Sequence, residues 1–310
     1  MNSASFNSKI LLFGEYSVII GSEALAIPYS LFSGKLNFSQ SYSNNESSKR
    51  ELLAFAKYLK NFDFPEVRWD ITSFAFDVEQ GLNFSSTIPH GYGLGSSGAL
   101  CAAIFDRYGV KREDWLGSWE WKTGAIKLQT IFKQMESHFH GSSSGVDPLI
   151  SYLNSPLHIS KSKEISAPKV PEAQGEGNGA IFLLNTGRAR RTEPLVNLFL
   201  EKLKVESFNK LCSQELCSLN NQLIKLFLAE DWTELDKVWR NLSVLQYENF
   251  SPMIPKLAQF DWQLGLNDKL FSLKLCGAGG GGFILGITPD FKKTQSTLSD
   301  YQLRAVYRFN

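Results

Sequence analysis

Two carboxylates, Glu136 and Asp147, lie eleven positions apart in the segment ESHFHGSSSGVD. One of them could hold a metal ion while the other accepts a proton from a substrate hydroxyl or orients it. Taken alone, Asp147 before Pro148 also fits a helix N-cap, and Glu136 fits a solvated helix position. His138 and His140 lack a third ligand at a suitable spacing, which favours a structural or substrate-wall role over zinc.

The glycine-rich segment GYGLGSSG, residues 91–98, directly precedes an apolar run that predicts a buried helix. A helix N-terminus exposes unpaired backbone N–H groups and a partial positive charge, so this loop could hold a phosphate. Ser96 and Ser97 add hydroxyls in the first turn, where one could bind Mg²⁺, although the P-loop pattern GxxxxGK[ST] is absent. A tight turn with a serine cap is the alternative that the loop allows by itself.

A third segment, KLCGAGGGG at residues 274–282, places five glycines in six positions between two apolar runs. Such a backbone can lie close against a ligand or another loop. A flexible hairpin connection explains one or two of these glycines but not five.

Composition limits the classes of protein to be considered. The chain has 310 residues, which favours two domains. Its net charge is +1, and no basic stripe or acidic tail indicates nucleic acid or membrane as a partner. The N-terminal apolar run is too short for a signal-peptide core, and no run approaches the length of a membrane span. The four scattered cysteines predict reduced thiols in a cytoplasmic protein.

Apolar spacing predicts a mixed α+β or α/β protein. Helices are expected around Leu128–Phe139 and Leu216–Phe227, and Asp231 with Glu234 predicts a capping box for a helix through Leu242. Two segments have linker composition, and we place the domain boundary in the second, 162–179. The expected strands are 9–15, 68–74, 181–184 and 283–287, and the first linker is 43–50.

Together, these segments resemble the motifs of the GHMP kinases, the family of galactokinase, homoserine kinase, mevalonate kinase and phosphomevalonate kinase. KILLFGEYSV from Lys9 is similar to the first motif, PHGYGLGSSGA from Pro89 to the second, and KLCGAGGGG from Lys274 to the third. The resemblance extends from residue 9 to about residue 287. Within the family, Glu136 to Asp147 resembles the E-x-x-x-H-G-x-x-S-G-x-D element of mevalonate kinases, and the segment from Thr186 resembles their T-G-x-x-R-x-T-x-x-L-V segment.

This resemblance implies an α+β protein with the GHMP kinase fold. Residues 1–175 would form an N-terminal domain like domain 2 of ribosomal protein S5, carrying ATP binding and catalysis. Residues 176–310 would form a ferredoxin-like C-terminal domain. The implied activity is transfer of the ATP γ-phosphoryl group to the 5-hydroxyl of mevalonate, in isoprenoid precursor synthesis.

The resemblance also assigns residues to roles. Asp147 would be the catalytic carboxylate with Lys9 as its cationic neighbour, and Ser97 and Glu136 would bind Mg²⁺. The ATP-binding residues would be Gly91, Gly93, Leu94, Gly95, Ser96, Ser97, Gly279 and Gly280, and the acceptor-binding residues Glu15, Tyr16, His140, Ser144, Gly145, Arg190 and Ala278.

Several positions depart from the mevalonate kinase pattern. Tyr16 stands where those enzymes usually have histidine and many phosphomevalonate kinases have tyrosine, so phosphomevalonate is the alternative acceptor. Gly98 stands where alanine is usual, and the usual Gly-Gly after Asp147 is missing. A non-catalytic sensor with this fold is a further alternative, against which the joint presence of the catalytic and metal-binding residue types argues. The expected partner is a small molecule, and the expected state is a monomer or homodimer.

Overall fold

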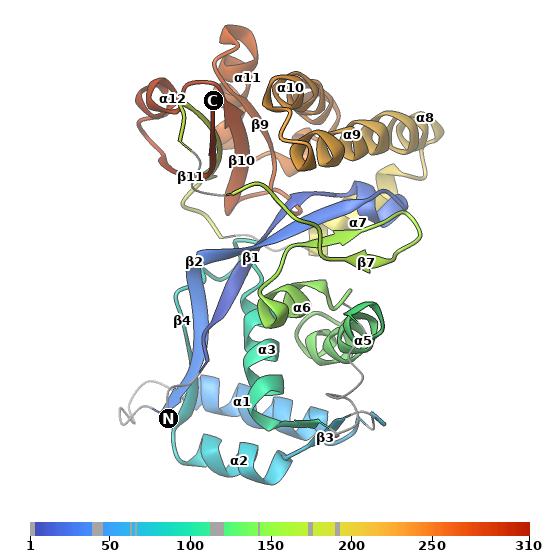
Figure 1. Cartoon of the computed structure of the whole chain (residues 1–310), viewed down its shortest axis with the longest axis vertical. Helices are drawn as coiled ribbons and strands as arrows, with labels where there is room; N and C mark the ends of the chain where they lie inside the picture. The colour runs from blue at the N-terminus through green and yellow to red at the C-terminus, as the bar shows by residue number, and fades with distance from the viewer. Residues whose placement is uncertain are drawn as a thin grey trace. The chain divides into compact units, whose positions relative to one another are not determined.

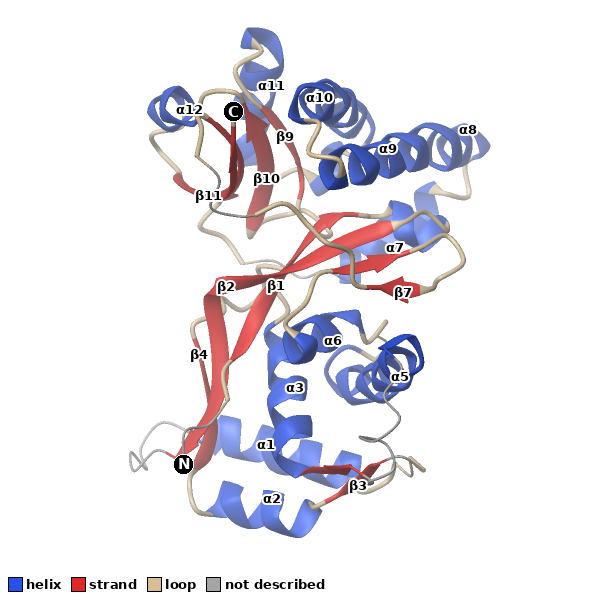
Figure 2. Ribbon diagram, viewed as in Figure 1, coloured by secondary structure: helices blue, strands red, loops and turns tan. Residues whose placement is uncertain are grey.

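The computed structural model describes residues 4–38, 46–62, 64–65, 67–111, 121–141, 143–172, 176–189 and 193–310. The chain contains both helices and strands, and the strand pairs of its four-stranded sheet are antiparallel, which confirms the α+β prediction (Figure 1, Figure 2). The chain divides into two compact units that are not consecutive in sequence. The first comprises Met1–Lys9, Ile27–Pro89 and Leu94–Ser155, and the second comprises Ile10–Ala26, His90–Gly93 and Pro156–Asn310. The division into domains 1–175 and 176–310 stays a prediction.

Two long strands, β1 (Phe6–Phe13) and β2 (Ala24–Phe38), contribute residues to both units. In the first unit β2 pairs antiparallel with β4 (Leu82–Ser86). A separate two-stranded sheet joins β3 (Val67–Trp69) to β5 (Gly109–Lys111). The helices described in this unit are α1 (Glu46–Leu59), α2 (Ile71–Glu79), α3 (Ser96–Tyr108), α5 (Trp121–His140) and α6 (Val146–Leu153).

Helix α3 is the centre of the first unit and packs against α2, α5 and α6 (Figure 1). Its middle, from Gly98 to Phe105, is buried at every position except Leu100. A helix that is apolar on nearly all sides is stable only when neighbours cover it, and its small residues let those neighbours approach closely. The packing of α3 therefore fixes its N-terminus, which directly follows the glycine loop.

The second unit contains a four-stranded antiparallel sheet in the order β11-β8-β10-β9. A group of helices lies between β8 and β9 in the chain, and α12 lies between β10 and β11. This is the β-α-β-β-α-β arrangement of a ferredoxin-like unit. The strands are β8 (Gly179–Asn185), β9 (Ser272–Leu275), β10 (Phe283–Thr288) and β11 (Gln302–Phe309).

Helices α10 (Trp232–Asn249) and α11 (Lys256–Asp268) pack against β9, and Trp239 and Trp262 are fully buried there. The other elements of this unit are β6 (Leu157–Ile159), β7 (Ile165–Ser166), α7 (Glu193–Lys202), α8 (Glu206–Lys210), α9 (Cys217–Leu228), α12 (Phe291–Thr297), the π-helical turn η2 (Leu211–Leu216) and the short 3₁₀ turns η1 (Ser17–Ile20) and η3 (Ser251–Met253).

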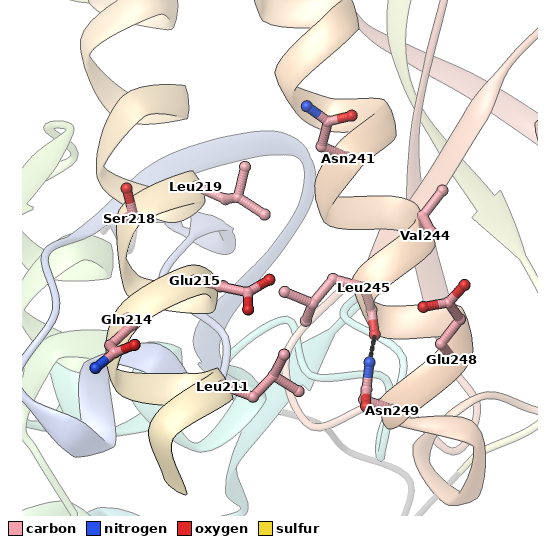
Figure 3. Close-up of a pocket in the computed structure, with 10 residues that line it drawn as sticks. All are labelled: Leu211, Gln214, Glu215, Ser218, Leu219, Asn241, Val244, Leu245, Glu248 and Asn249. Carbon is pink, nitrogen blue, oxygen red and sulfur yellow. Dashed lines mark hydrogen bonds between the residues drawn. The ribbon is translucent and has the colours of Figure 1, made fainter. Parts of the chain in front are cut away.

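A cavity of about 540 Å³ lies between η2 and α9 on one side and α10 on the other (Figure 3). Leu211, Leu219 and Leu245 give it an apolar floor, and Glu215 and Glu248 also line it. None of the predicted site residues lines this cavity.

Most expected elements are confirmed, including α5, α9, β8 and β10. Asp231 caps α10 as expected, because its carboxylate accepts a hydrogen bond from the Glu234 N–H at 3.1 Å. The reciprocal half of the capping box is not formed, since the Asp231 N–H donates to the Leu226 carbonyl at 3.0 Å. The described part of segment 162–179 lacks regular structure apart from β7 and the first residue of β8.

Three expected boundaries are wrong. The strand expected at 68–74 ends at Trp69, because the Asp70 side chain accepts a hydrogen bond from the Ser73 N–H and starts α2. The strand expected at 9–15 runs from Phe6 to Phe13. The linker expected at 43–50 contains the beginning of α1 from Glu46 onward, and its first three residues lie outside the described ranges.

No helix in the described ranges combines the length and the apolar character that a membrane crossing requires. All four cysteines are free thiols, and Cys101, Cys212 and Cys276 are buried.

Candidate active site

Three helix ends of the first unit carry the candidate site. Helix α3 begins after Gly95, which caps it in the left-handed conformation, and α6 begins after Gly145 in the same conformation. Helix α5 ends at His140, four residues after Glu136. The Glu136–Asp147 segment therefore consists of the end of α5, a short turn and the start of α6, and α6 packs against α5.

Lys9 and Asp147 form an ion pair, with 3.1 Å between Lys9 Nζ and Asp147 Oδ1. The Lys9 N–H donates a hydrogen bond to the carbonyl of Leu94 at 3.0 Å, which ties strand β1 to the glycine loop. A Cβ atom on Gly95 would lie 3.1 Å from Lys9 Cγ and 3.5 Å from Asp147 Oδ2. The strand, the glycine loop and the start of α6 thus meet around one carboxylate.

Glu136 is buried and receives a hydrogen bond on each carboxylate oxygen. Ser97 Oγ donates to Glu136 Oε1 at 3.0 Å, and Ser143 Oγ donates to Glu136 Oε2 at 2.5 Å. His140 Nε2 lies 2.9 Å from Ser97 Oγ. When Ser97 donates its single proton to Glu136, the matching His140 tautomer carries a proton on Nε2 and donates it to Ser97. The structure therefore brings the two predicted metal ligands into direct contact.

Burial, and in second place the nearby Asp147 carboxylate, raise the pKa of Glu136 to about 7. Hydrogen bonds from Ser143 and Ser97, and the positive charge of Lys9, act in the opposite direction. The ionised carboxylate thus costs free energy in the folded protein, and a bound cation would compensate that cost.

This environment predicts a pH-dependent gain in stability when Glu136 is made permanently neutral. The folded-state pKa is raised above the ordinary value of 4.5, so wild-type stability falls as pH rises from about 4.5 through about 7. The Glu136→Gln variant, without nucleotide or metal, is expected to resist denaturant better than wild type at pH 8, by on the order of 3 kcal/mol. Urea denaturation between pH 4 and pH 8 measures this, and a gain of equal size at pH 4 would contradict the explanation.

Asp147 is not the N-cap of α6, which was one interpretation of the sequence. Gly145 occupies the cap, and Asp147 lies inside the first turn, where its carboxylate is placed toward Lys9. Helix α6 also packs unusually close to α3. A Cβ atom on Gly98 would lie 2.8 Å from the backbone carbon of Asp147 and 2.8 Å from the nitrogen of Pro148. The glycine at position 98 therefore fixes how close the Asp147 backbone comes to α3.

Gly98→Ala is accordingly expected to destabilise the protein, although alanine is the better helix former. The added methyl group would meet backbone atoms that cannot rotate away, so α6 would have to shift, at a cost of about 1–3 kcal/mol. Thermal and urea denaturation test this expectation. A variant as stable as wild type would show that α6 moves without cost.

Apart from Ser96 and Ser144 of the first unit, the remaining predicted acceptor and nucleotide residues lie in the second unit or outside the described ranges. Glu15 is buried and pairs with Lys274, with 2.6 Å between Glu15 Oε1 and Lys274 Nζ. The Tyr16 hydroxyl donates to the carbonyl of Ala278 at 2.6 Å, so two predicted acceptor residues contact each other. Arg190 lies outside the described ranges.

The glycine loop at 277–282 is held by backbone contacts within its own unit. The Gly280 N–H donates to the carbonyl of Met253 at 2.5 Å, and a Cβ on Gly279 would lie 2.2 Å from the same oxygen. The Thr186 hydroxyl donates to the Gly282 carbonyl at 2.8 Å. The remaining nucleotide residues predicted in this unit, Gly91 and Gly93, both have a φ of 76°.

The sequence interpretation missed two residues, Ser143 and Lys274. Ser143 is one of three consecutive serines, and nothing in its type distinguished it from Ser144. Lys274 had a usable signal, because it is a charged residue in the apolar run FSLKL before the glycines. Lys274 is fully buried, and a buried ammonium group requires an anionic partner.

The donor set at Ser97 and Glu136 suits a hard divalent cation. Both side chains offer oxygen atoms, which Mg²⁺ prefers, and Mg²⁺ is often held by one or two carboxylates together with substrate phosphates. No group of three or more histidine, cysteine or acidic residues gathers within the described ranges. The two oxygen-bearing side chains fit an ion that takes further oxygen ligands from a phosphate.

Comparisons with known proteins agree with the resemblance of the motifs. Residues 50–155 match the family model described as the GHMP kinases N terminal domain. The mevalonate kinase of Archaeoglobus fulgidus is 25% identical over 296 residues, which cover 92% of this chain and 91% of that protein.

Two solved structures show the same fold. The Methanococcus jannaschii mevalonate kinase has a TM-score of 0.62 at 17% identity, covering 99% of this chain and 98% of that one. The Lactococcus lactis galactokinase complexed with galactose has a TM-score of 0.64 at 11% identity, covering 99% and 94%. Since enzymes named for different acceptors share the fold, the fold alone does not select the acceptor.

Proposed function

Because the chain belongs to the GHMP kinase family, we propose that it transfers the γ-phosphoryl group of ATP to a small alcohol, the 5-hydroxyl of mevalonate. The observation that carries the proposal is the convergence of two pairs, Lys9 with Asp147 and Ser97 with Glu136, at the starts of α3 and α6. The likeness to the Archaeoglobus fulgidus mevalonate kinase over most of the chain supports mevalonate as the acceptor.

On the acceptor side, Asp147 would receive the hydrogen bond of the substrate hydroxyl. Its carboxylate is about one-third exposed, which leaves it accessible to a ligand. As the hydroxyl loses its proton, the positive charge of Lys9 would stabilise the developing alkoxide. The proposed acceptor residues of the first unit are His140, at the end of α5, and Ser144 and Gly145, directly before α6.

On the phosphate side, the loop that ends at Ser97 would bind the ATP phosphates through the N-terminal amides of α3. Ser97 and Glu136 would hold Mg²⁺, which neutralises charge on the transferred phosphoryl group when it is bound. Phosphoryl transfer depends mainly on positioning and charge neutralisation, and residues held on β1, α3, α5 and α6 would supply both.

A non-catalytic sensor would not need this set of residues. Nucleotide binding alone requires neither the carboxylate at Asp147 nor its cationic neighbour. The two pairs together therefore favour an enzyme.

The test is ADP release in a coupled assay with Mg²⁺-ATP and mevalonate, phosphomevalonate, homoserine or galactose as acceptor. Saturable turnover with mevalonate is expected. Turnover with phosphomevalonate alone would change the acceptor but keep the reaction class. ATP binding without acceptor-dependent ADP release would refute the enzyme and favour the sensor.

A further inference from the structure

Ser143 occupies a position in the first unit that no motif of the sequence assigns. It lies between the end of α5 and the start of α6, in the turn that separates Glu136 from Asp147. Its hydroxyl makes two hydrogen bonds in a chain: it accepts from the Gly145 N–H at 2.9 Å and donates to Glu136 Oε2 at 2.5 Å. Because the backbone N–H can only donate, the Ser143 proton is directed at Glu136.

The turn that carries Ser143 is itself fixed against α5. Gly145 has a φ of 74°, and a Cβ atom there would lie 2.4 Å from the Gln129 carbonyl and 2.6 Å from the Lys133 nitrogen. The Gln129 side chain donates to the carbonyl of Ser144 at 3.0 Å. Ser143 thus presents its hydroxyl from a backbone that cannot easily move relative to the helix bearing Glu136.

The hydrogen bonds to Glu136 determine how its carboxylate is oriented. With Oε2 held by Ser143 and Oε1 held by Ser97, the plane of the carboxylate is fixed. The like charge of Asp147 is close enough to act on Glu136, so a carboxylate free to rotate could turn away from that charge. Partners that orient a metal ligand through its second oxygen commonly contribute to metal affinity without touching the metal.

We propose that Ser143 is a positioning residue for the divalent cation: its hydroxyl orients Glu136 so that the carboxylate and Ser97 Oγ together receive the ion that accompanies the nucleotide. This inference rests on the proposed function for the identity of the site. It concerns binding of the cation, however, and not transfer to any particular acceptor.

The test uses Mn²⁺ as a paramagnetic probe and a non-hydrolysable ATP analogue, with free Mn²⁺ followed by electron paramagnetic resonance. Ser143→Ala is expected to weaken Mn²⁺ binding by roughly tenfold or more, in the range seen when outer partners of metal ligands are removed. Ser143→Thr keeps a hydroxyl and should stay close to wild type. Ser143→Val has nearly the shape of threonine without the hydroxyl and should behave like alanine.

The matched control is Ser137→Ala, one position after Glu136. Ser137 is half-buried, and its hydroxyl donates to the Lys133 carbonyl at 2.7 Å rather than to Glu136. This control should bind Mn²⁺ like wild type, and metal-free binding of the analogue should be equal in all variants. Thermal denaturation checks that each variant is folded. If Ser143→Ala is unfolded, the comparison of Ser143→Thr with Ser143→Val still tests the hydroxyl.

Three results would overturn the inference: Mn²⁺ binding by Ser143→Ala at wild-type strength, equal weakening in the threonine and valine variants, or no Mn²⁺ binding by the wild-type protein with the analogue. Failure of the proposed function has a different signature. In that case Mn²⁺ binding would depend on the Ser143 hydroxyl as expected, while no acceptor in the coupled assay would be phosphorylated.

Discussion

Asp147→Asn is expected to abolish most of the turnover with mevalonate, lowering kcat by roughly 10²- to 10⁴-fold, the usual contribution of a positioned proton acceptor. The amide has the size of the carboxylate and can still contact the acceptor. It carries no negative charge, however, and it is a far weaker base. The Lys9 ammonium, 3.1 Å away in the wild-type protein, would lose its anionic partner.

The binding of ATP should change little in this variant, because the phosphates are proposed to bind the backbone amides at the start of α3 and not the Asp147 carboxylate. Titration of the non-hydrolysable analogue, measured beside kcat, separates the two effects. Asp106→Asn is the control, since Asp106 is an exposed carboxylate on α3. An Asp147→Asn enzyme that retained wild-type kcat would remove Asp147 from the chemistry and leave Lys9 without its proposed role.

The spacing of residues could predict much of this site because its parts are local. Glu136 and Asp147 are joined by one helix end and one turn, and Ser97 follows a glycine loop whose helix is marked by its apolar residues. The spacing of apolar residues predicts the helices that carry these side chains, and so it also predicts which of them come together. A ferredoxin-like C-terminal domain could also be predicted, but only through the resemblance of the motifs to a known family.

Other features depended on contacts that the sequence does not display. The segment RWDITSF has the β-branched and aromatic residues of a strand, but the Asp70 side chain caps a helix within it. The sequence shows only that Gly98 stands where alanine is usual, and its steric role follows from the short distance to the Asp147 backbone. The partner of Lys274 lies 259 positions away along the chain, so no local pattern could identify it.

The Lys274–Glu15 pair carries the second large expected effect. Lys274 Nζ is fully buried and donates three hydrogen bonds, to Glu15 Oε1 at 2.6 Å, to the Leu12 carbonyl at 3.0 Å and to the Leu275 carbonyl at 2.9 Å. The rings of Phe13 and Trp239 lie on its other sides, with centroids 5.8 and 5.6 Å away. Every proton of the ammonium group has an acceptor, and the surrounding aromatic rings exclude water.

Lys274→Met is therefore expected to lower the free energy of unfolding by about 3–5 kcal/mol, the usual result of removing one partner of a buried ion pair. Methionine fills a similar volume, so the loss comes mainly from the Glu15 carboxylate and two carbonyls left without this donor. The double variant Glu15→Gln with Lys274→Met removes both charges and should recover part of the loss. Urea denaturation of the single and double variants gives the coupling between the two sites.

Lys237→Met provides the matched control for Lys274→Met. Lys237 forms an ion pair of the same 2.6 Å length with Glu234, but both side chains are at least half exposed. Exposed pairs are screened by water, so this substitution should leave the denaturation midpoint almost unchanged. Equal effects of the two lysine substitutions would contradict the argument from burial. A large loss only at Lys274 would show that one buried charge pair stabilises the contact between the segment around Glu15 and the segment around Lys274.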